Sequence, residues 1–146
     1  MKKLTLVLSM VLLCATFMSA KGDDYVKTAN GIIYLKNMRF NLKSNCIGET
    51  INGEKLEFDK SEVLGYCKNG IQYEKMPVYK NNALTGEEEF MKVVSYRNGL
   101  KLYEYEYISK NTNSQARRYY VFKADKLVVE VDGTNKSTIT AFFNRK

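Results

Sequence analysis

Glu104 and Glu106 are the two residues whose type and spacing come nearest to a catalytic pair. Residues two apart share one face of an extended strand, and paired carboxylates carry out glycoside hydrolysis. The chain has no histidine, and it lacks both the G-x-S-x-G and the Ser-x-x-Lys motifs of activated serines. Charges on a solvated or ion-paired strand explain the two glutamates more simply. We predict no enzyme and no catalytic residue, with a carboxylate-dependent enzyme acting on a polysaccharide as the alternative.

Two acidic runs offer hard oxygen ligands for a metal ion, Asp23-Asp24 and Glu87-Glu88-Glu89. Neither run has the D-x-D-x-D-G spacing of a calcium loop, and the chain has no C-x-x-C pattern for zinc or redox chemistry. An acidic turn or the start of a helix accounts for both runs. The sequence therefore predicts neither a metal site nor a cofactor.

Arg117 and Arg118 precede two tyrosines, and Lys123 and Lys126 follow, in a chain whose formal net charge is +7. Phosphate contacts and base stacking would suit nucleic acid, but an exported protein seldom meets it. The same side chains suit an acidic polysaccharide, an anionic lipid surface or an acidic protein, and tyrosine and arginine are enriched at interfaces. We predict a protein or an acidic envelope polymer as the partner. The alternative is a tyrosine-rich sheet face that is half buried.

Tyr103, Tyr105 and Tyr107 alternate within one segment, so a strand would project all three rings the same way. Tyrosine tolerates exposure because its hydroxyl stays hydrated while its ring offers contact area. Together with Arg117 and Arg118 these tyrosines form the predicted binding surface. The opposite face carries Leu100, Leu102 and Ile108, but also Glu104 and Glu106, which leaves open that the tyrosines are the buried side.

β-Formers and period-two alternation dominate the chain after its first twenty residues, which predicts strands at 31–35, 55–58, 100–109, 118–122, 126–131 and 138–143. Between these runs lie Asn-Gly or Asp-Gly pairs, which accept the positive φ of tight hairpin turns. The pairs begin at Asn30, Asn52, Asn69, Asn98 and Asp132. The fold class predicted is mainly β, an antiparallel meander of short hairpins.

Residues 85–97 admit two interpretations. Thr85-Gly86-Glu87-Glu88 fits a helix capping box, and Phe90, Val93 and Val94 have helical spacing. The segment 92–96 is instead rich in β-branched residues and runs directly into the tyrosine strand. We favour a strand, with one short helix near 85–97 as the alternative.

The first twenty residues have the three-part order of a bacterial signal peptide: Lys2 and Lys3, an apolar stretch to Met18, and the small residues Ser19 and Ala20. The apolar stretch is shorter than the roughly 20 residues that span a bilayer as a helix. Leu13 before Cys14 argues against a lipoprotein anchor. We expect cleavage near residue 20, a single β-rich domain over 21–146 with no membrane span, and export to the periplasm, the cell surface or the medium.

Two cysteines remain after cleavage, Cys46 and Cys67. An even count in an exported chain predicts a disulfide between them, which would stabilise the fold by roughly 3 kcal/mol. Two buried free thiols are the alternative.

Residues 79–90, followed by Tyr96-Arg97-Asn98-Gly99 and 100–105, resemble the bacterial MORN-variant repeat, which runs T-G … Y-x-N-G-x-L-x-x-E-x-x-Y. The resemblance covers roughly residues 52–107, and such repeats recur in exported proteins and in the YwqK-type group. It implies stacked antiparallel hairpins and carries over no catalytic residue. The function expected is that of an exported binding or interaction protein, with a structural envelope-associated protein as a further alternative.

Overall fold

The computed structural model describes residues 24–41, 45–133, 137 and 139, so the predicted signal peptide lies outside the described residues. The fold is mainly β and antiparallel, as predicted. The strands are β1 (Asp24–Thr28), β2 (Gly31–Leu35), β3 (Asn37–Phe40), β4 (Cys46–Glu49), β5 (Lys55–Phe58), β6 (Val63–Lys68), β7 (Ile71–Lys80), β8 (Ala83–Arg97), β9 (Leu100–Ile108), β10 (Gln115–Lys123) and β11 (Lys126–Asp132).

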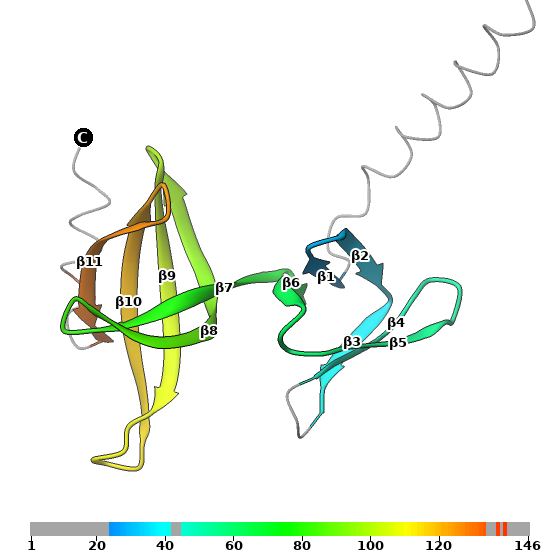
Figure 1. Cartoon of the computed structure of the whole chain (residues 1–146), viewed down its shortest axis with the longest axis horizontal. Coiled ribbons are helices and arrows are strands. Elements are labelled where there is room, and N and C mark those ends of the chain that lie inside the picture. The colour runs from blue at the N-terminus through cyan, green and yellow to red at the C-terminus, as the bar shows by residue number, and fades with distance from the viewer. Residues whose placement is uncertain (1–23, 42–44, 134–136, 138, 140–146) are drawn as a thin grey trace, which may run out of the picture.

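Two sheets make up the structure. An eight-stranded sheet has the order β11-β10-β9-β8-β7-β6-β1-β2, and a three-stranded sheet has the order β3-β4-β5. Figure 1 shows two lobes, an N-terminal lobe of β1 to β6 and a C-terminal lobe of β7 to β11. β7 belongs to both, because its residues 71–74 pair with β6 and its residues 73–80 pair with β8. This shared strand fixes side chains of both lobes on one continuous sheet.

Five of the predicted strands coincide with β2, β5, β9, β10 and β11 to within a few residues. The predicted strand 138–143 lies outside the described residues except for Ile139. Two-residue turns with positive φ at both positions connect four hairpins, at Asn69-Gly70, Asn81-Asn82, Asn98-Gly99 and Ala124-Asp125. The first and third were expected from their Asn-Gly pairs. β11 ends at Asp132, and a Cβ on Gly133 would lie 2.7 Å from the Arg117 carbonyl oxygen.

The segment 85–97 lies within β8, so the helical alternative is wrong. β8 pairs with β7 along its first part and with β9 along its last part. These ladders use many of its backbone N–H and C=O groups, and its β-branched residues fit a pleated surface. Gly86 has φ 84°, outside the helical region, which disrupts the expected capping box.

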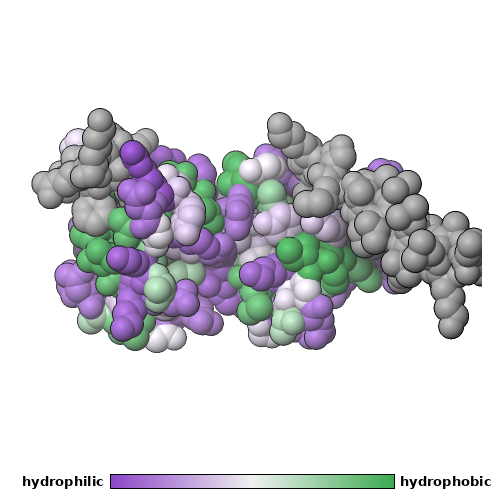
Figure 2. Space-filling view, turned by 90° about the horizontal axis from the view of Figure 1, so that it is seen from above, coloured by the Kyte–Doolittle hydropathy of each residue, from purple (hydrophilic) through white to green (hydrophobic). Residues whose placement is uncertain are grey.

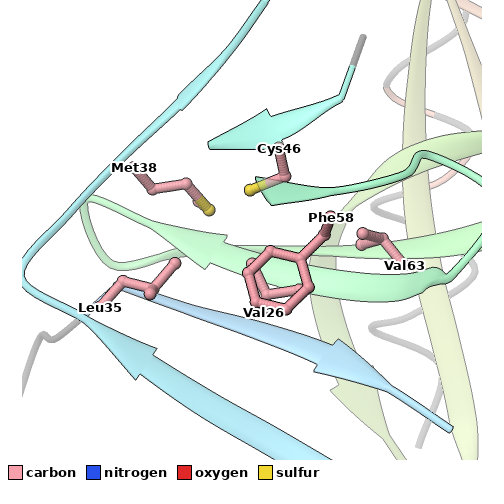
Figure 3. Packing of buried hydrophobic residues seen from close by; sticks show 6 residues of the cluster. All are labelled: Val26, Leu35, Met38, Cys46, Phe58 and Val63. Carbon is pink, nitrogen blue, oxygen red and sulfur yellow. The ribbon is translucent and has the colours of Figure 1, made fainter. Parts of the chain in front are cut away.

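The core of the N-terminal lobe lies between β1, β2 and the three-stranded sheet (Figure 3). Figure 3 shows Cys46 pointing into this cluster toward Met38, with Leu35, Val26, Phe58 and Val63 around them. Gly48 is needed here, because a Cβ at that position would lie 2.4 Å from a methyl group of Leu35.

The predicted disulfide is wrong: Cys46 and Cys67 are both free thiols. Cys46 belongs to the buried cluster, and Tyr66 packs against the same cluster. Since consecutive residues of a strand point to opposite faces, Cys67 points away from Cys46. Burial raises the pKa of the Cys46 thiol to about 11 despite the positive charge of Lys68.

The sheet of the C-terminal lobe is covered on both faces. The β7–β8 hairpin crosses one face of β9, β10 and β11 (Figure 1), and we call this the hairpin face. Val78 and Met91 of the hairpin pack there against Tyr103, Tyr120 and Phe122. On the opposite face Ile139 packs against Leu102, Tyr119 and Val121. Both sides of the tyrosine strand are therefore partly buried.

The surface of both lobes is mixed. Figure 2 shows hydrophobic residues in green interspersed with hydrophilic residues in purple on the face seen from above. Within the described residues, no helix is long and apolar enough to cross a membrane.

Candidate binding site

The five predicted binding residues divide between the two faces of the sheet. Tyr105 pairs with Arg118 across β9 and β10, and Tyr103 pairs with Tyr120. Alternation therefore places Tyr103, Tyr105, Tyr107 and Arg118 on the hairpin face. Arg117 lies on the opposite face, so the predicted surface is not a single surface.

Tyr103 is 2% exposed, and the expectation that its ring faces solvent is wrong. Its ring is buried in a cluster with Val78 and Met91 of the β7–β8 hairpin. Its hydroxyl donates a hydrogen bond to the Glu74 carboxylate. Lys101 Nζ lies 2.9 Å and 3.1 Å from the two oxygens of the same carboxylate. Sequence inspection missed this group, because Glu74 is far from β9 in the chain and no local pattern links them.

The Glu74 carboxylate is stabilised as an anion. Burial by itself would raise its pKa, but hydrogen bonds from Tyr103 and Lys101, with the charges of Lys101 and Lys27, hold the pKa below its ordinary value. Burial, and then the hydrogen bond to Glu74, raise the pKa of Tyr103. The pair remains a neutral phenol donating to a carboxylate across the physiological range.

Tyr105, Tyr107 and Arg118 form a stacked group toward the other end of the hairpin face. The rings of Tyr105 and Tyr107 are stacked with centroids 5.4 Å apart. The Arg118 guanidinium carbon lies 5.1 Å from the Tyr107 ring centroid. Arg118 also donates to the Tyr79 carbonyl at 3.0 Å and to the Tyr107 hydroxyl at 3.3 Å. Arg118 thus ties the hairpin to the sheet.

The charge of Arg118 is neutralised within the fold. Its Nε lies 3.4 Å from carboxylate oxygens of both Glu130 and Asp132, and its side chain is 14% exposed. Glu130 in turn accepts the Asn82 backbone N–H of the hairpin turn at 2.8 Å. Arg118 is therefore a structural residue more than a ligand-facing one.

The opposite face holds the two glutamates considered above as a catalytic pair. Arg117 Nε lies 2.9 Å from a Glu106 oxygen, and both side chains are about half exposed. Glu104 accepts the Tyr119 hydroxyl at 2.8 Å and lies 3.8 Å from Lys92 Nζ. Each carboxylate has its own partners, which is the arrangement of ion-paired strand residues.

Tyr107, Arg117 and Arg118 do meet at one place, an open pocket of about 590 Å³ where β11 ends. Gln115 and Asp132 also line it. Both arginines are already paired with carboxylates, so the pocket offers little unpaired positive charge to an acidic polymer.

A second concavity, which no sequence pattern indicated, lies where the two lobes meet. Two adjoining pockets of about 250 Å³ and 380 Å³ share Glu74, Met76, Lys101 and Asp125. We call the two pockets together the junction groove. Taken together, the two volumes fall within the range of ligand sites in proteins, which is about 300 to 1,000 Å³.

Charge is balanced in the centre of the junction groove. Lys101 contacts Glu74, and the positive charge of Lys27 also acts on Glu74. Asp125, in the turn between β10 and β11, lies close enough to raise the pKa of Tyr103 further. Lys75 borders the groove, but its ammonium is bonded elsewhere, to the Lys60 carbonyl at 2.7 Å.

Exposed apolar and aromatic side chains border the groove. Ile32 is 50% and Leu64 is 44% exposed on the N-terminal side, where Tyr25 also lines the wall. Tyr96 is 66% exposed on the C-terminal side. Such bare apolar groups beside polar ones are typical of interaction surfaces.

Within the described residues, the two acidic runs do not bring metal ligands together. Glu89 of β8 pairs with Lys60 at 3.1 Å. Alternation along the strand directs Glu88 to the other face. Asp24 accepts the Asn69 backbone N–H at 2.8 Å, while Asp23 lies outside the described residues. In the part of the chain that the structure describes, no three His, Cys, Asp or Glu side chains are grouped to hold a metal ion.

Comparison with known proteins returned no match: no family model, no curated protein and no solved structure is significantly similar to this chain. The resemblance to the MORN-variant repeat stays a prediction.

Proposed function

We propose that the protein is an exported, non-catalytic binding protein whose ligand lies in the junction groove. The observation that carries this proposal is the groove's composition: a charge-balanced centre of Glu74, Lys101, Lys27 and Asp125, flanked by exposed apolar and aromatic side chains. Such a mixture supplies both contact area and fixed hydrogen-bonding groups.

The groove is preorganised, which supports binding. Its centre lies on β7 and β9, interior strands of the eight-stranded sheet, and the Glu74 carboxylate accepts hydrogen bonds from Gln72, Lys101 and Tyr103. Side chains fixed in this way need little ordering when a ligand arrives, which favours affinity.

Binding is favoured over catalysis because the carboxylates in question are used as structural partners. Glu104 and Glu106 are engaged by Lys92, Tyr119 and Arg117. These contacts hold both carboxylates to the neighbouring strands β8 and β10, which supports a structural use.

The ion pairs of Arg117 and Arg118 bear on the choice of partner. With Glu106, Glu130 and Asp132 against them, the two arginines are a weaker anion site than the sequence suggested. The proposal therefore moves the binding surface from the arginine–tyrosine strand to the junction groove, with a protein or an envelope polymer as the class of partner.

Cosedimentation with isolated cell-envelope material tests the proposal. Ile32→Ser and Leu64→Ser remove apolar area at the groove without deleting a buried group. Ile51→Ser and Ile108→Ser are matched controls, since these residues are 74% and 71% exposed and lie outside the groove. We expect the groove variants to bind less and the controls to bind as the unmodified protein does. Equal binding by all four variants contradicts the proposal.

A further inference from the structure

The two halves of the junction groove form a trough with an aromatic ring in each half. Tyr25 lines only the half on the N-terminal lobe, and Tyr96 lines only the half on the C-terminal lobe. Glu74, Lys101 and Asp125 lie in the shared middle. A ligand that fills the trough must therefore be extended, with apolar surface in two places and polar groups between them.

The polar groups that the trough offers are side chains and not backbone. At its centre, Lys27, Glu74 and Lys101 each pair with residues on both neighbouring strands of the sheet. The backbone N–H and C=O groups are used in the ladders there. An extended peptide would find no strand edge to pair with at that point, whereas a ligand rich in hydroxyl groups needs only carboxylate acceptors and ammonium donors.

The charge of the trough argues for a neutral ligand. Lys27 and Lys101 face two carboxylates, Glu74 and Asp125, while the third lysine of the lining, Lys75, is hydrogen bonded to the Lys60 carbonyl. A polyanion would gain from the lysines and lose against the acids at close range. A neutral hydroxyl can donate to a carboxylate and accept from an ammonium, so it uses both kinds of group.

We propose that the junction groove binds a neutral oligosaccharide in extended form, with a sugar ring stacked on Tyr25 and another on Tyr96. The apolar C–H face of a pyranose matches a tyrosine ring, and the hydroxyls of the intervening sugars hydrogen bond with Glu74, Lys101 and Asp125. The inference rests on the proposed binding function and adds the class of ligand.

Calorimetric titration of the purified protein with defined sugars tests this inference. The neutral probes are cellohexaose, chitohexaose, mannohexaose and maltohexaose, and hexagalacturonate is the acidic probe. We expect at least one neutral hexasaccharide to bind, and Tyr96→Ala to weaken it by about tenfold or more, equivalent to ~1.4 kcal/mol. Tyr96 is the decisive position because it is 66% exposed, so its removal spares the fold. Tyr25→Ala should act in the same direction, and Ile51→Ala should leave the affinity unchanged.

Three results would overturn the inference: no neutral sugar binds, hexagalacturonate binds in preference, or Tyr96→Ala binds the sugar as tightly as the unmodified protein. The envelope assay separates this failure from that of the proposed function. If Ile32→Ser and Leu64→Ser still reduce envelope binding, the groove is a binding site and only the ligand class is wrong. If they do not, the proposed function fails as well.

Discussion

The Tyr103 hydroxyl donates a hydrogen bond to the Glu74 carboxylate and thereby joins β9 to β7, the strand that both lobes share. Lys101, two residues before Tyr103 on the same face, contacts the same carboxylate. This contact both stabilises the junction and fixes the centre of the groove.

Tyr103→Phe should therefore destabilise the fold. The ring stays in place, but the partly buried Glu74 carboxylate loses a donor, at a cost of about 1 to 3 kcal/mol. Denaturant unfolding measures this change. Tyr34→Phe is the control, because Tyr34 is 54% exposed, and it should unfold at the same midpoint as the unmodified protein. Identical midpoints for both variants would mean that the hydrogen bond contributes nothing.

Glu74 should also make stability depend on acid pH. Its pKa is lower in the folded state than its ordinary value of 4.5, so the folded state binds its proton less tightly than the unfolded chain. The resulting stability is fully present above the unfolded pKa and is lost as pH falls through the folded pKa. Unfolding free energies measured from about pH 6 downward should fall less steeply for Glu74→Gln. Parallel pH profiles would contradict the assignment.

Much of the fold could be predicted from local sequence patterns, whereas the pairing of the two cysteines could not. Asn69-Gly70 and Asn98-Gly99 specify their hairpins, because few residue pairs accept positive φ twice. Asn81-Asn82 and Ala124-Asp125 form the same kind of turn, but these residue pairs do not predict it from the sequence. Whether two cysteines meet depends on which face each strand presents, and that is set by tertiary packing.

Free thiols at both positions are a direct expectation. Protein purified without reductant should have the mass of two free cysteines, and reduction should leave that mass unchanged. Cys46 should resist thiol reagents near neutral pH, since it is fully buried and burial raises its pKa to about 11. A mass lower by the two hydrogens lost in disulfide formation would show that Cys46 and Cys67 are bridged and would contradict this expectation.

Arg118 and Arg117 should differ sharply although they are adjacent. Arg118→Met removes the cation that pairs with the poorly exposed Glu130 carboxylate, together with one of the two hydrogen bonds to the Tyr79 carbonyl, which should cost on the order of 3 kcal/mol. Arg117→Met removes an ion pair whose side chains are 53% and 44% exposed, which should cost less than about 1 kcal/mol. Thermal or denaturant unfolding of the two variants gives the comparison. Equal losses would show that Arg118 does not hold the hairpin.

The candidate site could be predicted only in part. Alternation placed Tyr103, Tyr105 and Tyr107 on one face, which the structure confirms, but it could not say that a hairpin covers that face. Leu102 on the other side is covered as well, by the packing of Ile139, so neither composition nor period distinguished inside from outside. The junction groove draws Tyr25, Glu74, Lys101 and Asp125 from distant parts of the chain. Only the order of the strands brings them together.

The most direct test of the binding site is a residue-by-residue map of amide chemical shifts on addition of soluble envelope polysaccharide. The account predicts that the largest shifts surround Glu74, on β1, β6, β7 and β9, with Asp125 among them. Shifts confined to the pocket of Tyr107, Arg117 and Arg118 would contradict it and return the binding surface to the arginine–tyrosine strand.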